Sequence, residues 1–220
     1  MEVVFKGRAV HAVMVGNGAL GALDGMICFF NAISHLRSTL SYPNQVHGVI
    51  TDGGVCPNVV PEKTAARFYI RARDKAALSD LVRRVVDCAR QAALSTGTEV
   101  FWHNYEQGYD NMITNRTLAR LFTSNLKELG IDCKSGPRNT LGSLDMGNVS
   151  HVVPALHPYL SLGPGLIPHT REFAQAAGSP QAGELVIRAA QALAWTAIDI
   201  FMRAELVREM WEEFRQHVRT

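Results

Sequence analysis

The chain has 220 residues, of which 47% are hydrophobic and 19% charged, and its formal net charge is +2. This length allows one large domain or two modest ones with a substantial core. The basic residues form no cluster and charges interrupt every long apolar run, so we expect no nucleic-acid partner, no secretory signal and no membrane partner.

The first half of the chain alternates strand-like and helix-like segments. The predicted order is a strand at 3–7, a helix at 19–38, strands at 46–51 and 65–71, a helix from 74 to 97 and a strand at 98–104. The helices follow from apolar residues at helical spacing, and the strands from alternation. This βαββαβ order is that of the ferredoxin-like fold, a four-stranded sheet covered on one face by two helices.

The second half is mainly helical by pattern. We predict a helix at about 114–129, a loop-rich stretch at 131–173 with one strand at Val149–Val153, a long helix from Ser179-Pro180 to about 201, and another from about 203. The apolar stretch 185–201 is predicted to be a buried helix. Because these helices have no strands of their own to cover, we expect 105–220 to belong to a larger α/β unit.

Three segments then stand out by their order and spacing: KGRAVHA (6–12), PNVVPEKTAARFYIRAR (57–73) and GSLDMGNVS with PHTREF (142–173). Together they resemble the M-twenty metallopeptidase family, which includes aminoacylases, glutamate-releasing carboxypeptidases, aminobenzoyl-glutamate hydrolases and dipeptidases. The resemblance runs from residue 2 to about 200, and it looks nearest to the dipeptidase and aminobenzoyl-glutamate hydrolase branch.

The resemblance implies an α/β protein with an α+β lid. Residues 1–105 would be the ferredoxin-like lid, which mediates homodimerisation in the family. Residues 106–220 would be the C-terminal segment of the zinc-peptidase α/β catalytic domain, with that domain's N-terminal half absent. The family's His-x-Asp metal motif and its catalytic glutamates do not precede the lid segment. The pair Glu212-Glu213 lies in the terminal helix, where we expect a solvated face.

Three lid residues are candidates for the site. His11 at a strand end is either a histidine of no special role or, by resemblance, the catalytic lid histidine that hydrogen-bonds the oxyanion in the partner's active site. Asn58 is either a turn asparagine or a substrate-binding residue. Arg71 is either a surface arginine or, with Asn58, a group that binds the substrate carboxylate across the dimer interface.

Two further candidates lie in the second half. Asp145 either stabilises its own loop or, by resemblance, contacts substrate. His169, in a Pro-His-Thr loop, would be a metal ligand, since neutral imidazole is a good ligand for zinc. His151 and His157 are interpreted as packing residues. A catalytic zinc usually needs three protein ligands, and the chain offers one convincing candidate.

The sequence therefore predicts part of a two-zinc amidohydrolase that cleaves a dipeptide or an N-acyl amino acid. We expect a chain that is inactive alone and is a truncated product, half of a split enzyme or an incomplete sequence. In a split enzyme, a separate N-terminal half would be its partner. The alternative is a non-enzymatic module for dimerisation or small-molecule binding. Four cysteines without CxxC spacing favour reduced thiols and a cytoplasmic location.

Overall fold

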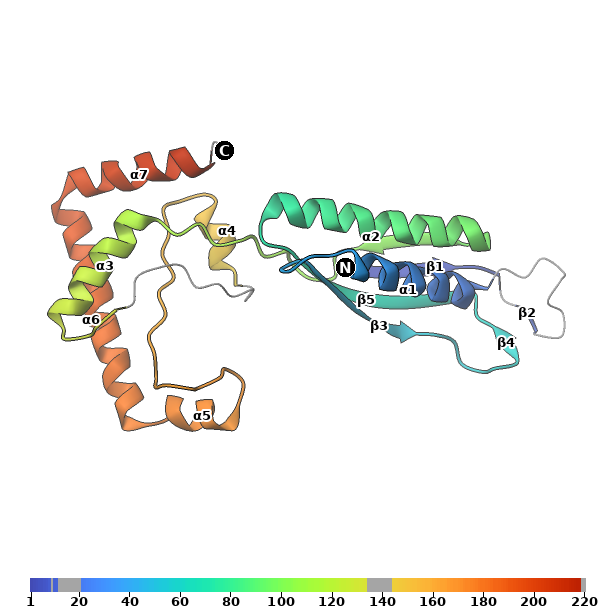
Figure 1. Ribbon diagram of the computed structural model, residues 1–220, viewed down its shortest axis with the longest axis horizontal. Helices are drawn as coiled ribbons and strands as arrows, with labels where there is room; N and C mark the ends of the chain where they lie inside the picture. Colours follow the sequence, from blue (N-terminus) through green and yellow to red (C-terminus); the bar gives the residue numbers. More distant parts are fainter. Residues whose placement is uncertain (9, 12–20, 134–143, 219–220) are drawn as a thin grey trace. The chain divides into compact units, whose positions relative to one another are not determined.

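The computed structural model describes residues 1–8, 10–11, 21–133 and 144–218 (Figure 1). Within the chain, Met1–Asn111 and Met112–Thr220 each form a compact unit. The boundary expected from the sequence lies slightly earlier, after residue 105. The two units are treated one at a time below.

The first unit contains a four-stranded antiparallel sheet. Its strands are β1 (Glu2–Lys6), β3 (Gln45–Asp52), β5 (Lys63–Arg71) and β6 (Glu99–His103), in the spatial order β3-β5-β1-β6. Helices α1 (Ala22–Ser38) and α2 (Lys75–Thr96) cover one face of the sheet (Figure 1). The predicted ferredoxin-like fold is therefore confirmed, with every predicted strand and helix of this half in place.

Aromatic rings fill the space between the sheet and its helices. Phe5 and Phe68 from the sheet and Phe29 from α1 are buried, and the Phe29 and Phe68 ring centroids lie 5.2 Å apart. Gly48 pairs with Phe68 across the sheet, and a Cβ atom at this glycine would lie 2.3 Å from the Phe68 ring. The absent side chain is therefore what allows the Phe68 ring to lie against the neighbouring strand.

Helix α2 begins and ends where its sequence predicts. The Asp74 carboxylate accepts a hydrogen bond from the Ala77 backbone N–H at 2.9 Å, which caps the N-terminus. Gly97 closes the helix with a φ of 71°, a conformation that glycine adopts without steric cost.

A second, two-stranded ribbon was not predicted. Strand β2 (Val10–His11) follows β1, and β4 (Val59–Val60) precedes β5; the two pair antiparallel, Val10 with Val60 and His11 with Val59. Figure 1 shows this ribbon beyond one end of the four-stranded sheet. Two-residue strands carry too little alternation to be recognised in a sequence.

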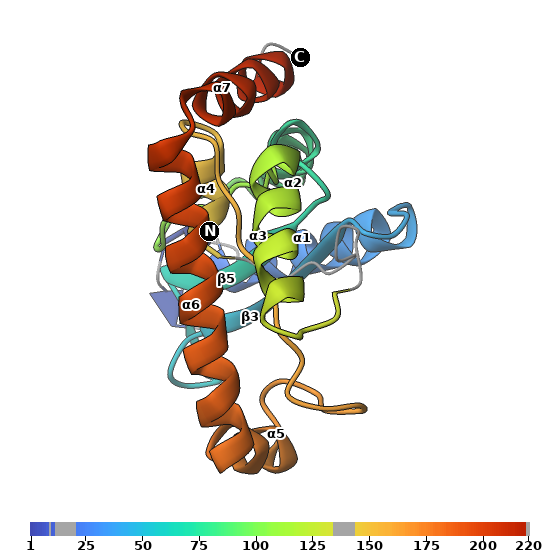
Figure 2. The same cartoon turned by 90° about the vertical axis from the view of Figure 1, so that its left-hand side faces the viewer.

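The second unit is built from helices: α3 (Arg116–Glu128), α4 (Met146–Ser150), α5 (Arg171–Ala177), α6 (Pro180–Met202) and α7 (Ala204–Val218). Long helix α6 has α3 beside it, with α5 at one end and α7 at the other (Figure 2). Buried Phe122, Leu126 and Ala192 join α3 to α6. Helices α3, α6 and α7 were predicted from the sequence, and short α5 was not.

The predicted strand at Val149–Val153 is wrong. Residues 146–150 form α4, and a turn follows them. The Ser150 hydroxyl is fully buried; it donates to the Gly147 carbonyl at 2.6 Å and accepts from the Ile113 backbone N–H at 2.9 Å. These bonds favour a helical turn, and a short apolar run cannot by itself distinguish strand from helix.

The prediction of a buried helix at 185–201 is also wrong within this unit. In α6 only 11% of the most apolar 18-residue window is buried, and the mean hydropathy of that window is 1.4. By length and composition alone, α6 is long and apolar enough to cross a membrane. The described residues therefore leave a large apolar helix surface exposed.

Candidate functional site

The ribbon brings two of the predicted lid residues together. The backbone of His11 pairs with Val59, so His11 lies one residue away from Asn58 along the neighbouring strand. Directly opposed residues in an antiparallel pair have Cα atoms about 5 Å apart. Asn58 is exposed in the turn that precedes β4. A polar group and an imidazole-bearing residue thus share the end of one projecting ribbon.

Arg71 lies at the opposite end of the lid. It is the last residue of β5 and pairs with Gln45, whereas Lys63 at the start of β5 pairs with Lys6 beside the ribbon. Arg71 is eight steps along the strand from Lys63, which corresponds to a span of about 27 Å. Because an extended dipeptide spans only about 7 Å, one substrate cannot contact Asn58 and Arg71 of the same subunit. The expectation that these two residues of one subunit act on the same carboxylate is therefore corrected.

The outer face of the sheet carries a network of charged and aromatic side chains that was not predicted. The Arg67 Nε atom lies 2.9 Å from Glu2 Oε1, and the Arg67 guanidinium lies 4.9 Å from the centre of the Tyr105 ring. The hydrogen bond from Arg67 lowers the pKa of Glu2. The alternation of Arg67, Tyr69 and Arg71 along β5 was the only signal for this face in the sequence.

Tyr69 belongs to the same face. Its hydroxyl donates to both carboxylate oxygens of Glu106, at 3.0 and 2.8 Å, and the Arg71 guanidinium lies 5.8 Å from the centre of its ring. The Glu106 hydrogen bond, helped by Tyr105, raises the pKa of Tyr69 to about 12. The aromatic neighbour of Arg71 is thus a phenol that ionises at higher pH than an ordinary tyrosine.

Asp145 precedes α4 and is exposed. Its side chain makes no capping hydrogen bond to that helix. The neighbouring Gly142 and Ser143 of the predicted glycine-rich loop lie outside the described residues. A role for Asp145 in substrate binding stays a prediction.

His169 has an unusual backbone. Its φ is 69°, which makes it the one residue other than glycine with a positive φ in the described ranges. Such a conformation costs a residue with a side chain about 1–2 kcal/mol. Strain of this kind clusters at functional sites. Thr170 follows directly, and its hydroxyl caps α5 by accepting from the Phe173 backbone N–H at 3.2 Å. His169 therefore directly precedes the capped N-terminus of α5.

The described residues do not assemble a metal centre by themselves. Across 1–8, 10–11, 21–133 and 144–218, no three histidine, cysteine, aspartate or glutamate side chains lie close enough to hold an ion together. His169 is exposed and would supply one ligand at most. The residues present therefore do not fit a catalytic zinc without further ligands.

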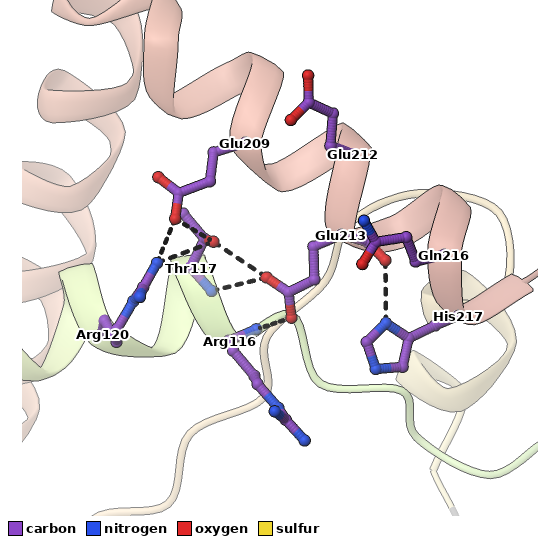
Figure 3. A pocket seen from close by; sticks show the side chains of 8 residues that line it. All are labelled: Arg116, Thr117, Arg120, Glu209, Glu212, Glu213, Gln216 and His217. Atoms are coloured by element: carbon purple, nitrogen blue, oxygen red, sulfur yellow. Dashed lines mark hydrogen bonds and ion pairs between the residues drawn. The ribbon is translucent and has the colours of Figure 1, made fainter.

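A shallow pocket of about 320 Å³ lies between the start of α3 and helix α7 (Figure 3). Glu213 from α7 accepts hydrogen bonds from the backbone N–H groups of Arg116, at 2.6 Å, and Thr117, at 3.0 Å. Arg120 forms an ion pair with Glu209. The Glu209 and Glu213 carboxylates are thus already engaged in contacts that join α7 to α3.

Glu213 corrects the expectation of a solvated Glu212-Glu213 face. Burial alone would raise the pKa of Glu213, but the backbone N–H groups of Arg116 and Thr117 and the Thr117 hydroxyl lower it overall. A carboxylate at this position satisfies N–H groups that an α-helix leaves without partners. The neighbouring Glu212 is exposed, as expected.

Comparisons with known proteins give one family match and several relatives. Residues 1–97 match the family described as the peptidase dimerisation domain. The Xaa-Arg dipeptidase of Mus musculus is 37% identical over 221 residues, which cover 98% of this chain and 51% of that protein. One of the subunits of p-aminobenzoyl-glutamate hydrolase from Escherichia coli is 30% identical over 127 residues, or 57% of this chain and 26% of that protein.

A solved structure shows the same fold. The aminobenzoyl-glutamate utilization protein of Klebsiella pneumoniae superimposes with a TM-score of 0.62 at 15% identity, over 90% of this chain and 47% of that one. The chain spans about half the length of the two dipeptidases it matches. The chain is thus related to the M-twenty family of peptidases and amidohydrolases, and it resembles the C-terminal portion of these enzymes, with the peptidase dimerisation domain at residues 1–97.

Proposed function

We propose that this chain forms the lid and part of the catalytic unit of an amidohydrolase that cleaves a dipeptide or an N-acyl amino acid. The observation that carries the proposal is the ribbon, which sets His11 beside Asn58 on a lid of the dimerisation-domain type. The relatives that share nearly the whole chain include two named as dipeptidases. That substrate class is the one we propose here.

In this proposal the lid residues divide between two subunits. His11 and Asn58 of one subunit would act with Arg71 of its partner, because strand β5, about 27 Å from Lys63 to Arg71, separates the ribbon end from Arg71 within one subunit. Arg71 would pair with the substrate carboxylate through its planar guanidinium. His11 would donate a hydrogen bond to the oxyanion formed when the amide carbonyl is attacked, a contribution of about 10²–10³ in rate for one such donor.

The dimer would form through the β3 edge of the sheet. An unpaired edge strand presents a row of backbone groups to a second copy of the same strand. At the other edge, Lys6 and Arg90 already lie over the Phe101 and Trp102 rings, at 5.0 and 4.9 Å. Along β3, in contrast, Val49 is 61% exposed.

Zinc and the complete catalytic unit also belong to the proposal. His169 would supply one zinc ligand and Asp145 would contact substrate, with the remaining ligands from the part of the relatives that this chain does not match. We expect the chain to be inactive without that part. We propose a cytoplasmic location because Cys28 and Cys56 are exposed free thiols, which persist in reducing compartments.

The test is a chimera in which this chain replaces the matched portion of the mouse Xaa-Arg dipeptidase. With zinc present, we expect the chimera to hydrolyse dipeptides at about 1 s⁻¹ or faster, the usual range for enzymes, and the chain alone to show no turnover. Arg71→Ala in the chimera should chiefly raise KM, since it removes a contact to bound substrate. A folded, dimeric chimera without turnover on dipeptides or N-acyl amino acids would contradict the proposal and favour a non-enzymatic dimerisation module.

A further inference from the structure

Strand β5 places an aromatic ring beside Arg71. Tyr69 and Arg71 are two residues apart on this strand, so their side chains project from the same face of the sheet. Phe68 lies between the sheet and its helices, which puts Tyr69 and Arg71 on the outer face. The Arg71 guanidinium lies 5.8 Å from the centre of the Tyr69 ring, within the range of a cation–π contact.

The Tyr69 ring is itself held by its neighbours. Its hydroxyl donates to both carboxylate oxygens of Glu106, at 3.0 and 2.8 Å, and the Tyr105 ring meets it edge to face, with the ring centres 6.3 Å apart. Tyr105 in turn lies 4.9 Å from the Arg67 guanidinium, and Arg67 is bound to Glu2. The ring beside Arg71 is therefore fixed both at its hydroxyl and against a second ring.

An arginine that binds a carboxylate benefits from such a fixed neighbour. Two parallel hydrogen bonds form only when the plane of the guanidinium meets the carboxylate in one orientation. A long side chain that is free before binding loses conformational entropy when it adopts that orientation, and this loss weakens affinity. A ring that restricts the guanidinium before the substrate arrives removes part of the loss.

We propose that Tyr69 is a positioning residue, whose ring holds the Arg71 guanidinium ready to pair with the carboxylate of the substrate. The inference rests on the proposed function, because that function assigns the carboxylate to Arg71. Two other roles would make Tyr69 matter without Arg71: direct contact with the substrate, or stabilisation of the lid. Tyr69 is 53% exposed, so its ring adds little to the buried core.

The experiment compares three variants in the mouse chimera. Tyr69→Leu removes the ring, and Tyr69→Phe keeps the ring without its hydroxyl. Phe101→Leu is the matched control, since it removes another exposed ring of the lid that lies beside a cation, the Lys6 ammonium at 5.0 Å. Each variant is measured for kcat and KM on a dipeptide, and Tyr69→Leu is measured again in the Arg71→Ala background.

We expect Tyr69→Leu to raise KM about three- to fivefold, the size of an exposed cation–π contact, with little change in kcat. Tyr69→Phe should lie closer to the unmodified chimera than to Tyr69→Leu, and Phe101→Leu should leave KM unchanged. In the Arg71→Ala background, Tyr69→Leu should lower kcat/KM no further, because no guanidinium remains for the ring to hold.

Three kinetic results would overturn the proposal. The first is a Tyr69→Leu effect of equal size with and without Arg71, which would assign direct contact or lid stability to Tyr69. The second is a Tyr69→Phe variant as impaired as Tyr69→Leu, since the ring would then not be the part that acts. The third is an unchanged KM in Tyr69→Leu.

A second measurement needs no turnover. Nuclear magnetic resonance relaxation of the Arg71 Nε–H group reports the order of this side chain in the chain alone, with the signal assigned by its loss in Arg71→Lys. The order should fall in Tyr69→Leu and stay in Phe101→Leu; an unchanged order in Tyr69→Leu would refute the positioning role. If the chimera is inactive, the proposed activity fails and this measurement alone decides whether Tyr69 holds Arg71. An active chimera with an unchanged KM in Tyr69→Leu sinks the inference and leaves the activity standing.

Discussion

Tyr69 shows how a single hydrogen bond changes the chemistry of the lid surface. Its phenol donates to Glu106, so ionisation would place two negative charges together, and the pKa of Tyr69 rises to about 12. Because the folded pKa is raised above its ordinary value of 10.0, the contact is fully present below that value and is lost as pH rises through about 12.

Glu106→Gln removes the negative charge that raises the pKa of this phenol. We expect the pKa of Tyr69 to fall towards its ordinary value, and a spectrophotometric titration of the tyrosines should show the latest-ionising phenol shifting to lower pH. Tyr69→Phe is the control, since it should remove that phenol altogether. If the late phenol persists in Tyr69→Phe while circular dichroism shows a folded protein, the assignment to Tyr69 is wrong.

At the scale of residues, the sequence selects candidate site residues but does not show which of them lie close together. Asn58 and His11 were selected as separate candidates, and their proximity follows from a ribbon of two-residue strands that no periodicity could reveal. Arg71 is separated from them by the length of strand β5. The strand register, which places Arg71 opposite Gln45, cannot be read from the sequence. The positive φ of His169 likewise follows from the turn around it and not from its own identity.

At the scale of elements, Glu213 joins α7 to the start of α3. Its carboxylate accepts from two backbone N–H groups in the first turn, where the helix has no internal partners for them. Asn115 strengthens the same junction: its side-chain oxygen caps Leu118 at 3.1 Å, and its amide donates to the Met210 carbonyl at 3.0 Å. The end of the chain is therefore tied to a helix nearly a hundred residues earlier.

Glu213→Ala should lower the free energy of unfolding of the second unit by about 1 kcal/mol, the usual cost of losing a helix cap. The adjacent and exposed Glu212→Ala is the matched control and should change it little. Urea unfolding followed by the fluorescence of Trp195 and Trp211 measures both variants. Since the folded pKa of Glu213 lies below 4.5, its contribution is present above that pH and is lost as pH falls through the folded value. The two variants should therefore converge in acid, and a difference that persists there would contradict the carboxylate's role.

Elements with strong local signals were predictable, and those made by distant contacts were not. Asp74 and Gly97 bound α2 by local chemistry, and Ser179-Pro180 does the same for the start of α6. Helix α4 instead depends on a bond between Ser150 and the backbone of Ile113, 37 residues earlier in the chain. Without knowledge of this contact, the short apolar run at Val149–Val153 is predicted to be a strand.

At the scale of the whole molecule, the two units differ in how completely they bury their apolar side chains. The lid buries a continuous core between its sheet and two helices. The second unit leaves Ile187, Leu193 and Phe201 of α6 exposed and, among its described residues, forms a single parallel bridge. The sequence predicted helices without strands of their own in this half, and the larger α/β unit expected from them stays a prediction.

The proposed division of the site between subunits predicts a specific pattern of rescue in the chimera. At a substrate concentration well below KM, His11→Ala and Arg71→Ala should each remove most of the activity. A mixed dimer of the two variants contains one site with both defects and one site with neither, if His11 of one subunit works with Arg71 of the other. Random mixing makes half of the dimers mixed, so about one quarter of the wild-type activity should return.

A second mixture separates this arrangement from its alternatives. His11→Ala mixed with Asn58→Ala should show no rescue, because both residues lie on the same ribbon and each site in the mixed dimer then carries one defect. Val49→Lys at the β3 edge should prevent dimer formation, as sedimentation would show, and with it the rescue. Rescue in the His11–Asn58 mixture would contradict the proposed site. So would the absence of rescue in the His11–Arg71 mixture when mixed dimers form.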